Sequence, residues 1–310
     1  MKIVTYRELE SKDALFPLLD NAFGWPFNPR MNEKLVKTDP RLRNSPVGFC
    51  AVENEHAIGH VGVMDLSTRT LDGRLEYVGG IYGVATLPSH ARKGISTTLM
   101  NRAHEHFRER NYRFSFLCTS HTLVAYSMYQ KLGYTDLLER SSVYKVLNQK
   151  KIKAATEQRS GKIDFDRLLK FYDKSVKGKT GFVVRDKAYL EMLKKTGYFS
   201  SRDGIIEKDG YVIFRSNIGG TWSKATWIRE LLASSAEQMN DLVANVEAKA
   251  KDLIMDRGVF GNTLLQVYKS RDYMIEKRSH AVMMVKPLTA DASLRKIYGD
   301  KFFLTDLDFF

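Results

Sequence analysis

Residues 78–134 read VGGIYGVATLPSHARKGISTTLMNRAHEHFRERNYRFSFLCTSHTLVAYSMYQKLGY, and this stretch decides the fold of the chain. It predicts a strand, a basic turn that contains glycine, a helix, a second strand and a second helix. Gly79, Gly80 and Gly83 interrupt the first strand. Glycine inside a strand marks a bulge or a close approach of another backbone, and simple packing against a helix is the alternative. We expect this strand to be distorted.

The turn before the first helix has the features of an anion site. The strand ends at Leu87-Pro88, and HARKGIS, residues 90–96, leads into a helix with apolar residues at every fourth position: Ile95, Leu99, Ala103 and Phe107. The first N–H groups of a helix lack partners within it and carry partial positive charge. With Arg92 and Lys93 beside them, they form a site for an anion such as a pyrophosphate.

Two motifs in this stretch resemble the cofactor-binding core of the GCN5-related N-acetyltransferases (GNAT superfamily), whose turn reads Arg/Gln-x-x-Gly-x-Gly/Ala. Gly94 and Ser96 take the two glycine positions, and Ala91 stands where Arg or Gln is usual. Downstream, AYSMYQKLGY is similar to the family's second motif, with Tyr129 and Gly133 in the matching positions. The glycine-rich strand resembles, more narrowly, the tandem-domain Eis-type branch, although its full-length members carry a third domain.

The resemblance implies a fold, a cosubstrate and a set of site residues. The fold is α/β (α+β), with two tandem GNAT-like domains, each a mixed, mostly antiparallel sheet flanked by helices. The cosubstrate is acetyl-CoA, and the residues that would hold it are Val84, Ala85, Arg92, Lys93, Gly94, Ile95 and Ser96. Tyr129 would protonate the departing thiolate, and a core aromatic is the alternative for this residue.

Length and composition agree with a globular protein of two domains. The chain has 310 residues, 43% of them hydrophobic, and a mean hydropathy of −0.34. Charges interrupt every apolar run well short of a membrane span, so we expect a cytoplasmic protein. Cys50 and Cys118 fit neither a disulfide framework nor metal-ligand spacing, and no metal is expected.

The formal charge of +13 raises the alternative of nucleic-acid binding. The basic residues are scattered, however, rather than interleaved with aromatic residues on one element, so this alternative is not favoured. The charge also suits a polyanionic cofactor. Self-association stays open.

The order of predicted elements repeats along the chain. We expect a catalytic domain at 1–148, a linker at 149–162, a second GNAT-like domain at 163–286 and a tail at 287–310. In the second domain we predict a long helix that reaches Ile254, then strands at Thr263 to Val267 and His280 to Lys286. This domain lacks the phosphate turn, because Ser234 and Glu237 have the spacing of a capping box. We therefore expect one cofactor site.

The general base is not fixed by the sequence. The side-chain candidates are Glu76, Asp65, His60, His104, His106 and His121. The C-terminal segment KFFLTDLDFF is too apolar for a solvated tail, so it should dock. In Eis-type proteins the terminal carboxylate serves as the base, which by resemblance points to Phe310. A tail that only holds the domains together is the alternative.

These features predict an acetyl-CoA-dependent N-acetyltransferase that moves an acetyl group to a primary amine of a small molecule or protein by direct attack. The alternative is a CoA-binding regulatory or interaction module without transfer chemistry. The acceptor and the preferred acyl chain lie beyond the sequence.

Overall fold

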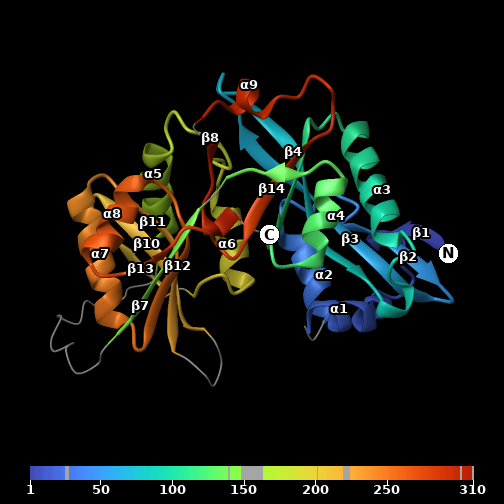
Figure 1. Ribbon diagram of the computed structural model, residues 1–310, viewed down its shortest axis with the longest axis horizontal. Helices are drawn as coiled ribbons and strands as arrows, with labels where there is room; N and C mark the ends of the chain where they lie inside the picture. Colours follow the sequence, from blue (N-terminus) through green and yellow to red (C-terminus); the bar gives the residue numbers. More distant parts are fainter. Residues whose placement is uncertain are drawn as a thin grey trace. The chain divides into compact units, whose positions relative to one another are not determined.

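The computed structural model describes residues 1–24, 28–138, 140–147, 163–200, 202–218, 224–300 and 302–308. These residues form two compact units, each with its own sheet (Figure 1). The first unit contains Met1–Leu137 and Met283–Asp300, and the second contains Leu138–Val282 together with residues 302–308. The predicted fold class, two mixed sheets flanked by helices, is confirmed.

The sheet of the first unit is antiparallel from β1 to β4, and β4 and β5 are parallel. In sheet order its strands are β1 (Lys2–Thr5), β2 (Gly48–Glu53), β3 (His56–Arg69), β4 (Leu75–Thr86), β5 (Phe114–Thr119), β14 (Val282–Pro287) and β6 (Thr135–Asp136). The α-helices are α1 (Phe16–Phe23), α2 (Pro29–Thr38), α3 (Ile95–Glu109), α4 (Val124–Lys131) and α9 (Leu294–Tyr298). Short 3₁₀ helices are η1 (Tyr6–Glu8), η2 (Lys12–Leu15) and η3 (Pro88–His90).

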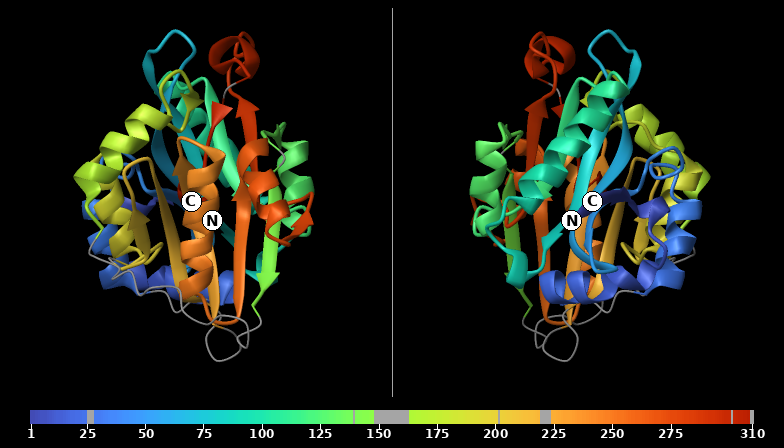
Figure 2. Two further views of the ribbon diagram at one scale, coloured as in Figure 1. Left: turned by 90° about the vertical axis from the view of Figure 1, so that its left-hand side faces the viewer. Right: turned by 90° about the vertical axis from the view of Figure 1, so that its right-hand side faces the viewer.

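Helix α3 crosses one face of this sheet (right view of Figure 2). The residues predicted to form its apolar stripe are all buried. Gly79 on β4 allows the close approach, because a Cβ atom there would lie 2.4 Å from the ring of Phe107. Gly79 is therefore a packing glycine, the alternative that the sequence left open, and the distortion of the strand must lie elsewhere.

The second unit contains the other sheet. In sheet order its strands are β13 (Met274–Glu276), β7 (Ser141–Val146), β12 (Leu253–Val259), β11 (Ala225–Ala233), β10 (Gly210–Ile218) and β9 (Gly204–Ile206). The helices are α5 (Phe165–Ser175), α6 (Lys187–Lys195), α7 (Ala236–Lys249) and α8 (Asn262–Ser270). Strands β8 (Thr180–Gly181) and β15 (Phe302–Phe303) form a short parallel pair, and η5 (Asp306–Asp308) follows. Every helix in the described ranges is too short or too polar to cross a bilayer.

The two units share one order of elements. The run β9, β10, β11, α7, β12, α8 and β13 repeats β2, β3, β4, α3, β5, α4 and β6. In the first sheet, β14 from the C-terminal half of the chain lies between β5 and β6. In the second sheet, β7 from the N-terminal half lies between β12 and β13. This division differs from the expected boundaries at 148 and 286. A short alternating strand fits either sheet, so its pattern does not say which one it joins.

Two elements of the second unit correct the sequence prediction. The long helix ends at Lys249, and Ile254 lies in strand β12 instead. The segment Thr263 to Val267 belongs to α8 and is not a strand. The buried residues of α8, Leu264, Val267 and Tyr268, have helical spacing, which a five-residue apolar run is too short to reveal.

Candidate active site

Strand β4 carries a bulge at the point where the sequence predicts distortion. His60 pairs with Ala85 and Gly62 pairs with Tyr82, so Gly83 and Val84 together face the single residue Val61. Gly83 has φ +54°, a conformation that glycine adopts without strain. The His60 ring donates from Nδ1 to the carbonyl oxygen of Gly83 at 2.7 Å, which holds the bulge from the neighbouring strand. Burial lowers the pKa of His60, so the ring is neutral.

Strands β4 and β5 separate just before the bulge. Their parallel pairing ends at Ile81 and Leu117, although β4 runs on to Thr86 and β5 to Thr119. Val84 and Ala85, two of the predicted cofactor residues, lie on the part of β4 that is not paired with β5, although Ala85 still pairs with His60 on β3. Their main chain therefore presents polar groups on the β5 side to which no described strand is paired.

The predicted phosphate turn is exposed and leads directly into α3. Arg92 and Gly94 have φ +62° and +80°, and Gly94 is the N-cap of α3 with no side chain capping it. Thr98 donates its N–H to the carbonyl oxygen of Gly94, but the preceding N–H groups of the first turn make no hydrogen bond to any described residue. The first turn contains no acidic residue. Ser96 Oγ lies 2.6 Å from Thr86 Oγ1, which joins the start of the helix to the end of β4.

The corresponding helix of the second unit, α7, has a capped N-terminus. Its N-cap is Ser235, whose Oγ accepts a hydrogen bond from the N–H of Gln238 at 3.1 Å. The cap therefore lies one residue later than the predicted pair of Ser234 and Glu237. Ser234 Oγ instead donates to the carbonyl oxygen of Asp209. The shift leaves the physical consequence unchanged, because a side chain already satisfies an N–H group that a phosphate would need.

Tyr129 projects from α4 and is 6% exposed. Burial, followed by the neighbouring Cys118 thiol, raises the pKa of Tyr129 to about 12, so its hydroxyl keeps its proton at neutral pH. No hydrogen-bond partner for this hydroxyl is present in the described part of the chain, whereas nearby Tyr134 bonds to His104 and Ser115. Tyr129 therefore holds a proton near the end of β5 that is not engaged by the fold.

The two acidic candidates for the general base are used in ion pairs. Glu76 pairs with Arg113 at 2.5 Å and also accepts a hydrogen bond from the hydroxyl of Tyr298. Asp65 pairs with Arg110 at 3.2 Å. Each carboxylate is thus already engaged by an arginine of the first unit.

Of the four candidate histidines, His121 has the geometry of a base. Its Nε2 lies 2.7 Å from Asp136 Oδ2, and the Tyr126 hydroxyl donates to the same carboxylate at 3.1 Å. The ring is partly exposed, with a side-chain exposure of 30%. His104 bonds to Tyr134 in the core, and burial lowers the pKa of both His104 and His106. The sequence could not single out His121, because it lies in the turn after β5 and its partner Asp136 lies 15 residues later, on β6.

Phe310 lies outside the described residues, and so does Phe309. The segment before them is buried in the second unit, where Phe303, Leu304 and Leu307 are fully inaccessible to solvent. An ionic network that the sequence analysis missed also holds this segment: Arg185 pairs with Glu230 and with Asp308 at 2.8 and 2.7 Å. Its members lie far apart in the sequence, and no spacing pattern links them.

Comparison with known proteins points to one family for the first part of the chain. Residues 5–136 match the model of the acetyltransferase (GNAT) domain family. No curated protein matches the sequence. Solved structures with a similar fold include a GCN5-related N-acetyltransferase from Kribbella flavida, at 16% identity and a TM-score of 0.64, covering 92% of this chain and 70% of that one.

Two further structures have the same fold. A GCN5-related N-acetyltransferase from Anabaena variabilis is 15% identical with a TM-score of 0.63, covering 93% of this chain and 73% of that one. Eis1 from Mycobacterium abscessus is 14% identical with a TM-score of 0.57, covering 93% of this chain and 74% of that one. Residues 5–136, which contain the bulged β4 and the uncapped α3, thus match the GNAT acetyltransferase domain family, and the chain shares its fold with these solved structures.

Proposed function

We propose that the chain is an acetyl-CoA-dependent N-acetyltransferase that acetylates a primary amine of a small molecule or a protein. The observation that carries this proposal is the uncapped N-terminus of α3, which starts directly behind the bulged end of β4. A pyrophosphate would accept hydrogen bonds from the N–H groups of Gly94, Ile95 and Ser96. Arg92 and Lys93 are exposed beside them and would add positive charge.

The acetyl group would lie along the part of β4 that is not paired with β5. A main-chain N–H of Val84 or Ala85 would donate to the thioester carbonyl and stabilise the negative charge that develops there. The amine nitrogen attacks the carbonyl carbon, a base takes the proton from that nitrogen, and the carbon–sulfur bond breaks. Tyr129 then gives its proton to the sulfur, so that the products are an amide and a free thiol.

We propose the C-terminal carboxylate of Phe310 as the base. His121 is the alternative, since among the described residues it has the geometry of a base. The burial of residues 302–308 supports a docked tail. The Asp136 carboxylate would hold the His121 ring in one orientation, as an orienting acid does in other catalytic pairs.

A second reading is a CoA-binding module that has lost its transfer chemistry. Both readings require the site in the first unit, and we propose that the second unit binds no CoA. Release of free thiol from acetyl-CoA, followed with a thiol reagent in the presence of a panel of polyamines, aminoglycosides and lysine peptides, separates them. Amine-dependent release with a matching acetylated product is expected, and binding of acetyl-CoA without release for any amine would favour the second reading.

A further inference from the structure

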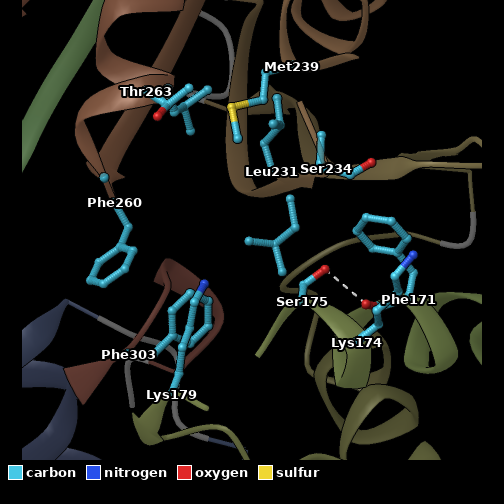
Figure 3. A pocket seen from close by; sticks show the side chains of 14 residues that line it. Phe171, Lys174, Ser175, Lys179, Leu231, Ser234, Met239, Phe260, Thr263 and Phe303 are labelled. Carbon is cyan, nitrogen blue, oxygen red and sulfur yellow. Dashed lines mark hydrogen bonds between the residues drawn. The ribbon is translucent and has the colours of Figure 1, made fainter. Parts of the chain in front are cut away.

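The second unit has a cavity at the counterpart of the proposed acetyl site. The parallel pairing of β11 and β12 ends at Ile228 and Asp256, although the strands run on to Ala233 and Val259. This repeats the separation of β4 from β5. A cavity of about 400 Å³ is lined by the end of β11, the start of α8 and helix α5 (Figure 3). That volume is in the range of small-molecule sites.

The walls of this cavity are mainly apolar. Leu231, Met239 and Leu264 line it together with aromatic rings, among them Phe260 and Phe303. The rings of Phe260 and Phe303 pack edge to face, with centroids 5.0 Å apart. Phe303 comes from the C-terminal segment and is fully buried, so the docked segment completes the cavity. Such walls favour an apolar ligand body.

The charge of the lining has a single sign. Lys174 and Lys179 line the cavity, and its lining residues include no aspartate or glutamate. The Lys179 ammonium lies 4.4 Å from the centroid of Phe303, and it makes no hydrogen bond or ion pair to a described residue. Partial burial lowers the pKa of Lys179, and the charge of Glu230 offsets this only in part. A ligand carboxylate beside Lys179 would supply the missing partner.

The cavity does not suit the cosubstrate proposed for the first unit. The N-terminus of α7, which corresponds to that of α3, is closed by Ser235 and has Glu237 in its first turn. A pyrophosphate would therefore meet an N-terminus at which a side chain already occupies the N–H of Gln238, together with the negative charge of Glu237. The polar groups that remain near the apolar walls are hydroxyls, including those of Ser175 and Thr263, and the two lysines.

We propose that this cavity binds a hydrophobic carboxylate, a small organic acid whose apolar body packs against Phe260, Phe303 and Leu231 and whose carboxylate pairs with Lys179. This site is separate from the proposed acetyl-transfer site, and the inference does not depend on that function.

Calorimetric titration of the full chain with octanoate tests this inference. The wild-type chain should bind one octanoate, equally well with and without saturating acetyl-CoA. The variant Lys179→Met keeps most of the aliphatic stem but removes the charge, so it should weaken binding by about tenfold or more. Thr263→Trp, at an exposed position of the lining, should abolish binding by filling the cavity.

The matched control is Lys177→Met, which removes an exposed lysine two residues away that does not line the cavity. This variant should bind octanoate as the wild type does, and octylamine, which has the same apolar body and the opposite charge, should not bind. The inference is overturned if octanoate does not bind, if octylamine binds as well, if acetyl-CoA displaces octanoate, or if Lys177→Met weakens binding as much as Lys179→Met. Thermal melting of each variant establishes that it is folded.

Discussion

The hydroxyl of Tyr129 combines two properties that a proton donor needs. Burial raises the pKa of Tyr129 to about 12, so the group is protonated throughout the neutral range. The described part of the fold uses this proton in no hydrogen bond, unlike the hydroxyl of Tyr134 in the adjacent core. A purely structural tyrosine of this burial is normally hydrogen bonded, which favours the functional role.

Replacing Tyr129 by phenylalanine should separate that role from packing. The ring and its contacts stay, but the proton is lost, so turnover should fall about 100-fold while the acetyl-CoA dissociation constant hardly changes. Steady-state kinetics and calorimetry measure the two quantities. Full turnover in Tyr129→Phe rejects the role, and a large loss of thermal stability instead assigns the residue to the core.

The two proposed bases make opposite predictions. One glycine appended after Phe310 moves the carboxylate by about 3.5 Å, so turnover should fall if that group is the base, with the melting temperature unchanged. His121→Gln should then leave turnover within a few-fold of wild type. If His121→Gln lowers turnover and the added glycine does not, the base is the His121–Asp136 pair.

Helix α3 serves the site and the core at once. Its N-terminus faces the proposed phosphate, and its later turns bury Ala103, His104 and Phe107 against the sheet. Burial, together with the nearby charges of Lys286 and Arg108, lowers the pKa of His104 to about 3. The folded protein thus holds this ring neutral, while the unfolded chain would protonate it below about pH 6.5.

Stability should therefore depend on pH through His104. The stabilising contribution is fully present above about pH 6.5 and is lost as the pH falls toward 3, because only the unfolded state takes up the proton. The loss from this group is at most about 1.4 kcal/mol for each pH unit. Urea midpoints between pH 7 and 4.5 should fall less in His104→Gln than in wild type. His56→Gln, at an exposed position, is the control, and equal slopes in all three proteins would contradict the prediction.

Local sequence signals predicted most elements around the site, because those elements depend on near neighbours in the chain. Glycine in β4, the apolar stripe of α3 and Gly133 behind α4 are all such signals. The prediction of β12 and α8 failed, since short apolar runs suit a strand and a helix equally. The His121–Asp136 pair had no signal, because it joins the turn after β5 to β6 across helix α4, and no spacing pattern marks such a contact.

Strands β7 and β14 are exchanged between the two sheets, and this limits where the chain can be divided. Each sheet is complete only when a strand from the other half has been inserted, so neither half of the sequence contains all of one unit. Alternation of side chains gave no sign of this, because it fixes the buried face of a strand but not its partners. Truncation at the expected boundary near residue 148 should remove β14 from the first sheet and leave that fragment unstable.

Truncation can be tested by expressing residues 1–148 alone and following amide hydrogen exchange. Without β14, the β5 and β6 amides should lose protection, because both strands neighbour it in the sheet. Adding a peptide of residues 280–300 should restore part of it. A fragment as protected as the full chain would show that the inserted strand is dispensable.

Calorimetry with acetyl-CoA addresses the proposed site most directly. We expect one molecule bound per chain, and we expect Gly94→Glu to abolish binding, because its carboxylate would stand at the uncapped start of α3. Gly73→Glu is a matched control: both glycines have positive φ, +84° and +80°, with no atom within 4 Å of an added Cβ, so strain and added charge are alike. Gly73→Glu should bind as wild type does. A folded Gly94→Glu variant with unchanged affinity, or a stoichiometry of two in the wild type, would contradict a single site at the start of α3.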